Sequence, residues 1–464
     1  MREKYMKIRE RFSLLILMGY IFFSITLLFI PLGVEDLFLI LSYFTLFFFV
    51  FFFLNYLFPF FNLRLSGKII LGYLFFAYVV KLLYVLAFTE RVKAFNQLSV
   101  DIVLDNLTVL LPEILLPTLG LVVVIWVFSS VSDKKSYSSC NFDIKMNKLF
   151  VFIFIVILAK FFIHNYLSWG VPGVEPKNVI PGITGLLTFF VRFPLFCIVN
   201  VYFIISIYKK SRCYSFLSIM LILFYVLIDL LNGSKYSLIY EVFFLMFALY
   251  FAYKNSLIRL KSVCLFIIVA SFVLPIYKYI NYIRFATMDG AGIYQAIEVA
   301  SINVNEKKVT FLDEFINRIN GIEHSLYALN SNLSSSKFDL MSLLTDQMAV
   351  AYTESVTGVG GIVNSVGSSQ VAVIILNSNF YLDSLLLSIC YFSLSFIVLR
   401  WMFFCFSKKI TSNKIQALSL EVIFSLFYIY FLFGTGNFIF FLKEMLVISA
   451  SFLLLKLFVI NDAK

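Results

Sequence analysis

Long runs of apolar residues are the feature that most limits what this chain can fold into. A helix that crosses a bilayer needs about 20 mostly apolar residues, and about twelve runs of that length follow one another along the chain. We place them at residues 13–31, 37–60, 68–88, 108–129, 148–166, 183–208, 214–232, 235–253, 262–279, 381–405, 415–433 and 437–459. The sequence therefore predicts an all-α integral membrane protein.

The composition excludes several other classes of protein. Hydrophobic residues make up 61% of the 464-residue chain and charged residues only 14%, which is too few charges to cover a soluble domain of this length. The net charge of +11 lies in short loops between apolar runs, where membrane orientation explains it, so we expect no nucleic-acid partner. The six cysteines form no CxxC pair, and we expect neither disulfides nor a metal site.

The loop charges predict an orientation. Basic residues crowd the first eleven positions and every second loop thereafter, for example Lys134 and Lys135 or Lys408 and Lys409, whereas the intervening loops are neutral, acidic or mixed. Cytoplasmic loops carry such an excess of Lys and Arg, so both termini are expected in the cytoplasm. The chain then divides into spans one to nine (1–279), a large extracytoplasmic loop (280–380) and spans ten to twelve (381–464).

The large outer loop is too long for a plain connection and is expected to be functional. Residues 309–330 carry apolar side chains at roughly helical spacing, which predicts an amphipathic helix or helix pair on the outer surface. The Gly- and Ser-rich stretch at 356–370 is interpreted as flexible backbone or a mobile lid.

Ionisable residues inside the spans gather at one depth, just beneath the outer surface. They include Lys81, Lys160, Arg192, Asp229, Lys235, Glu241, Lys443 and Glu444. Charges within spans are costly and mark functional sites. An enzyme acting on a lipid head group would place them at this depth. The alternative for Lys81 and Lys160 is that a long side chain simply reaches the interface.

Four cations suit a phosphate or pyrophosphate ligand, because guanidinium groups match phosphate oxygens. They are Arg192 in span six, Lys235 at the start of span eight, and Arg284 and Arg318 in the outer loop. The alternative for the two loop residues is a solvated surface charge. Glu323 and His324 are candidates for a general base that takes a proton from a hydroxyl group, although such a pair is also a common surface feature.

Four segments in a fixed order resemble a known family. They are LLTFFVRFPLFCIVNVYFI around Arg192, NGSKYSLIYEVFF around Lys235, YKYINYIRFATMDG around Arg284 and FLDEFINRINGIEHSLYAL around Arg318. On this topology they resemble the bacterial O-antigen polymerase (Wzy) and oligosaccharide repeat-unit polymerase family.

The resemblance implies a fold like that of the GT-C glycosyltransferases and a location in the bacterial inner membrane. It implies an undecaprenyl-pyrophosphate-linked oligosaccharide as substrate and transfer of the growing glycan to a new lipid-linked unit. Arg192, Arg284 and Arg318 would bind the pyrophosphate, with Lys235 as a weaker member, and Glu323 or His324 would act as base. No cofactor is expected, and a chain-length regulator is an expected partner.

Three other functions fit parts of the pattern. A flippase for lipid-linked oligosaccharides would have charges across the full membrane depth and short outer loops. An O-antigen ligase would share the arginines and the large loop. A solute transporter would lack the ordered arginine positions.

Overall fold

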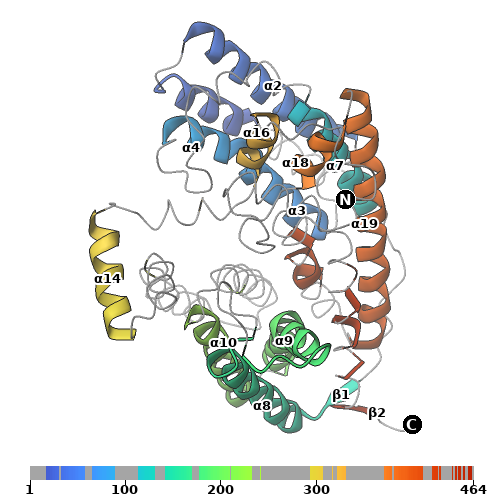
Figure 1. Ribbon diagram of the computed structural model, residues 1–464. Helices are drawn as coiled ribbons and strands as arrows, with labels where there is room; N and C mark the ends of the chain where they lie inside the picture. The colour runs from blue at the N-terminus through green and yellow to red at the C-terminus, as the bar shows by residue number, and fades with distance from the viewer. Residues whose placement is uncertain are drawn as a thin grey trace. The chain divides into compact units, whose positions relative to one another are not determined.

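The computed structural model describes residues 17–30, 33–57, 65–88, 113–130, 142–169, 177–209, 211–231, 241, 279, 293–306, 316, 321–330, 370–378, 381–410, 421–426, 428–429, 442, 445–446, 448–450, 453–454 and 458–461. The expected spans at 235–253 and 262–279 lie almost entirely outside these residues, as does the expected lid. The described part is helical apart from one short two-stranded ladder (Figure 1).

Within the described residues, three helices are long and apolar enough to cross a membrane: Ser66–Ala87, Met146–Asn165 and Leu382–Cys405. Shorter apolar helices cover Leu17–Leu27, Leu115–Phe128, Pro194–Ile207 and Cys213–Asp229. Each of the seven falls within or closely overlaps a run that we expected to span. The helices are those of a multi-pass membrane protein.

The contacts divide the chain into two units, each built from separated segments. The first comprises Met1–Lys135, Ile319–Arg400 and Phe427–Phe440, and the second comprises Ser136–Arg318, Trp401–Leu426 and Phe441–Lys464. The large loop expected at 280–380 is thus shared between both units.

The first unit contains helices α2 (Val34–Leu57), α3 (Leu65–Phe75), α4 (Lys81–Ala87), α7 (Leu115–Ser130), α16 (Ile322–Asn330), α18 (Gln370–Asn377) and the first two thirds of α19 (Tyr381–Ile410). A π-helix, η2 (Phe76–Val80), joins α3 to α4 without a break. Such wider turns occur often at functional sites. The Tyr43 hydroxyl of α2 donates to the carbonyl oxygen of Tyr78 at 3.5 Å. A side chain of a neighbouring helix thus supplies a hydrogen bond to a backbone carbonyl group of η2.

Two short helices that belong to the expected outer loop pack in this unit. Helices α16 and α18 contact each other, α16 also contacts α4, and α18 contacts α7. We expected an amphipathic helix or helix pair over 309–330. Helix α16 forms the second half of that segment, and most of the first half lies outside the described residues. Helix α18, which the sequence did not suggest, accompanies it.

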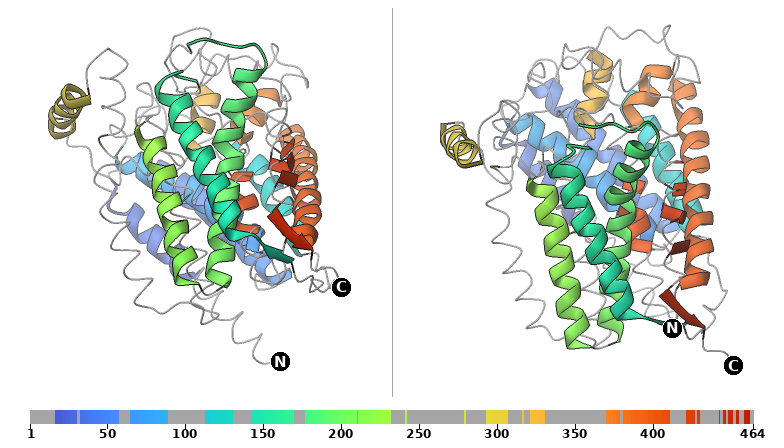
Figure 2. Two further views of the ribbon diagram at one scale, coloured as in Figure 1. Left: turned by 90° about the horizontal axis from the view of Figure 1, so that it is seen from below. Right: turned by 60° about the horizontal axis from the view of Figure 1, so that its bottom comes forward.

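The second unit contains a bundle of three long helices, α8 (Met146–Asn165), α9 (Ile183–Tyr208) and α10 (Arg212–Leu231), which lie side by side (Figure 2). All three are apolar around most of their circumference, as expected for helices in lipid. The hydroxyls of Ser206 and Ser218 lie 3.0 Å apart and link α9 to α10. Helix α14 (Ile293–Glu306) also belongs to this unit and was not expected from the sequence.

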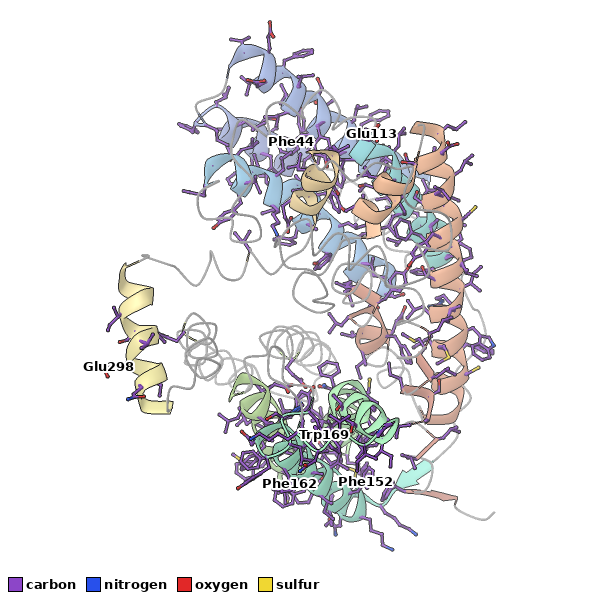
Figure 3. All side chains as sticks on the ribbon, in the orientation of Figure 1. Phe44, Glu113, Phe152, Phe162, Trp169 and Glu298 are labelled. Atoms are coloured by element: carbon purple, nitrogen blue, oxygen red, sulfur yellow. The ribbon has the colours of Figure 1, made fainter. Side chains whose placement is uncertain are left out.

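Trp169, which follows α8, lies against the bundle (Figure 3). Trp169 packs with Ile163 and Val191, and its indole N–H donates to the Lys177 carbonyl oxygen at 2.5 Å. The Nδ1 atom of His164 lies 2.7 Å from the Trp169 carbonyl oxygen, which requires that nitrogen to carry the ring hydrogen. These bonds join Trp169 to the end of α8 and to Lys177.

A small antiparallel ladder departs from the all-helical expectation. Strands β1 (Phe142–Ile144) and β2 (Val459–Asn461) pair Phe142 with Asn461 and Ile144 with Val459. The Lys145 amide donates to the Phe458 carbonyl oxygen at 2.9 Å and extends the contact. The ladder joins the segment before α8 to the C-terminal segment, a pairing too distant in sequence to be suggested by local pattern.

Candidate functional site

The structure places only some of the six predicted site residues. Glu323 and His324 lie in the first turn of α16, and Arg192 lies within α9. Lys235, Arg284 and Arg318 lie outside the described residues. The side chain of Glu323 is described, whereas Arg192 and His324 are placed by their backbone alone. The roles predicted for all six stay predictions.

Glu323 forms a buried ion pair with Lys81. The Lys81 ammonium at the start of α4 contacts the Glu323 carboxylate in α16, and the two side chains are 1% and 0% exposed. The Lys81 ammonium is therefore enclosed by protein. It joins a membrane helix to the loop helix that carries two of the predicted site residues.

The turn before Glu323 lies against the π-helix. Gly321 comes so close that a Cβ atom there would be 2.4 Å from the Ala77 carbonyl oxygen and 2.7 Å from the Ala77 Cβ. Only glycine allows two backbones to approach to this degree. Gly321 is fully enclosed, as are Ile322 and Leu326 on the same short helix. The N-terminal end of α16 is thus embedded in protein.

The surroundings of Glu323 have two opposing effects on the pKa of its carboxyl group. Burial raises the pKa of Glu323 above its usual value, whereas the Lys81 ammonium and the backbone N–H groups of Gly321 and Glu323 oppose that rise. A carboxylate in the first turn also faces the positive end of the helix dipole. The group is held by one cation and by backbone donors at the same time.

A second polar cluster lies within the α8–α9–α10 bundle. The Lys160 ammonium of α8 lies 2.5 Å from Asp229 Oδ1 of α10 and 3.7 Å from the centre of the Tyr225 ring. Lys160 is 0% exposed, so its ammonium is also enclosed by protein. The aromatic face and the carboxylate together stabilise the ammonium.

Glu241 and Asn200 lie near this cluster. The Asn200 side-chain amide of α9 donates to Glu241 Oε1 and to the Phe196 carbonyl oxygen, both at 2.9 Å. Glu241 interacts electrostatically with Asp229 and Lys160. Arg192 lies on the same helix, eight residues before Asn200.

The sequence identified most of these charged residues but not their partners. One local signal was available. Residues four apart lie on the same face of a helix, and this spacing separates Tyr225 from Asp229 and Lys160 from His164. Asn200 was missed because a single Asn in an apolar run gives no charge signal. Among the described residues, no group of three or more His, Cys, Asp or Glu side chains could hold a metal ion.

Comparisons with known protein families, with curated protein sequences and with solved structures return no match to this chain.

Proposed function

We propose that this protein is a polymerase of undecaprenyl-pyrophosphate-linked oligosaccharide repeat units, acting at the outer face of the bacterial inner membrane. The proposal includes about twelve spans, a GT-C-like arrangement and cytoplasmic termini. One observation supports it most. The buried Lys81–Glu323 pair joins α16, which bears His324, to a membrane helix. A catalytic loop segment anchored to membrane helices suits a reaction on a lipid-linked substrate.

The proposed reaction is a glycosyl transfer between two lipid-linked units. A hydroxyl oxygen at the non-reducing end of the new unit attacks the anomeric carbon of the growing glycan. The bond from that carbon to the pyrophosphate oxygen breaks, and undecaprenyl pyrophosphate leaves with the electron pair. Arg192, Arg284 and Arg318, with Lys235, stabilise the charge that develops on the leaving group. Of the two base candidates, Glu323 and His324, the proposal favours His324 as the acceptor of the hydroxyl proton, because the Glu323 carboxylate is paired with Lys81 inside the protein.

The same residues define the test in cells. In a strain that depends on this protein for its surface glycan, Arg192→Ala and Arg318→Ala should abolish long glycan chains while protein remains in the membrane. The matched control is Lys177→Ala, which removes an exposed cation from the loop before α9 and should leave the chain-length ladder intact. Normal ladders in both arginine variants would contradict the proposal.

A further inference from the structure

The turn that precedes α16 contacts a membrane helix close to its midpoint. The helix Ser66–Ala87 has 22 residues and is long and apolar enough to cross a membrane. Ala77 lies at its middle, about 15 Å from either end at a rise of about 1.5 Å per residue. A Cβ atom at Gly321 would be 2.4 Å from the Ala77 carbonyl oxygen. Because the apolar core of a bilayer is about 30 Å thick, the backbone at Gly321 lies near mid-depth.

A second contact gives the direction of α16. Glu323 in its first turn pairs with Lys81, which is further along the membrane helix toward Ala87. The two contacts follow both chains in the same order, so α16 runs from the middle of the span toward the Ala87 end. Its nine residues rise by about 13 Å, which is close to the distance that remains to that end.

Helix α18 accompanies α16 inside the first unit. The two helices contact each other, and α18 also contacts the apolar helix α7. The sequence of α18, QVAVIILN, contains no charged residue, and its described side chains are all buried, namely Val371, Ala372, Ile374 and Ile375. The membrane helix Leu382–Cys405 begins shortly after α18 ends. Helices that end at membrane depth are tolerated where protein encloses them, and both short helices meet that condition.

We infer that α16 and α18 form a re-entrant pair, embedded in the membrane within the segment that the sequence assigns to an outer loop. The chain enters the membrane before Gly321 and returns toward its surface through α16. Residues 321–326 then lie below the level of the lipid head groups. One consequence rests on the proposed function: the substrate must be inserted in the bilayer through its lipid to reach His324.

Electron cryo-microscopy of the full-length protein in lipid nanodiscs tests the inference without a measurement of activity. The two ends of Ser66–Ala87 mark the thickness of the bilayer. Gly321 should lie near the midplane of the disc, and Asn330 near the head-group level. A helix α16 that lies outside the head-group layer, or flat along it, would overturn the inference.

A comparison of two carriers tests the consequence for the substrate. The same repeat unit is supplied to the protein in liposomes on a long polyprenyl pyrophosphate and on a short, water-soluble prenyl pyrophosphate. Only the membrane-inserted unit should be elongated. Equal elongation of both would refute the approach through the bilayer but leave the polymerase activity standing. Elongation of neither, with α16 embedded in the disc, would contradict the proposed function and leave the re-entrant pair confirmed.

Discussion

Replacing Lys81 by Met should detach α16 from the first unit. The substitution leaves the Glu323 carboxylate buried without its ammonium, since the two side chains are 1% and 0% exposed. Removing one partner of such a pair costs about 3–5 kcal/mol, whereas replacing both partners by uncharged groups is often close to neutral. Lys81→Met combined with Glu323→Gln should therefore cost less than Lys81→Met alone.

Two assays measure this prediction. Equilibrium unfolding of the purified protein in mixed detergent gives the free energies for the double-mutant cycle. Hydrogen exchange of peptides covering residues 322–330 reports whether α16 opens locally, and exchange there should rise in the single variant and fall again in the double. Lys148→Met, at an exposed position in α8, controls for the loss of a lysine. A stability of Lys81→Met within about 0.5 kcal/mol of the unaltered protein, or simple additivity of the two substitutions, would show that the ion pair does not hold α16 in place.

Two other predictions follow from close backbone contacts. Gly321→Ala should destabilise the protein by about 1–3 kcal/mol, because the new methyl group would meet the Ala77 carbonyl oxygen at 2.4 Å. Gly72→Ala, where no atom lies within 4 Å, should be neutral or stabilising by the same unfolding assay, and equal losses in both would argue against the contact. Deleting residues 459–464 removes β2, so amide exchange across Phe142–Ile144 should accelerate, and unchanged protection of that strand would count against the pairing.

The spans could be predicted because each depends on its own local run of residues. The boundaries of α9 agree with the expected 183–208, and α8 differs from expectation by only a residue or two. The helix η2 could not be foreseen, because its residues Phe-Ala-Tyr-Val-Val suit an ordinary helix equally well. Tertiary packing decides such a local widening.

The ion pairs could not be predicted because their partners are remote in sequence. Lys81 and Glu323 are 242 residues apart, and hydropathy scores each residue without reference to a partner. For Lys81 and Lys160 the sequence left a choice between a functional charge and a side chain that reaches the interface. The structure adds what the sequence could not supply, namely that both ammonium groups are enclosed by protein and paired with Glu323 and Asp229.

An assay with purified components shows whether the protein itself joins repeat units. The full-length protein in detergent is incubated with one lipid-linked repeat unit, and the products are separated by mass. The expected products are glycans of two and more units together with free undecaprenyl pyrophosphate. Recovery of the repeat unit unchanged by protein that is folded and intact would contradict it.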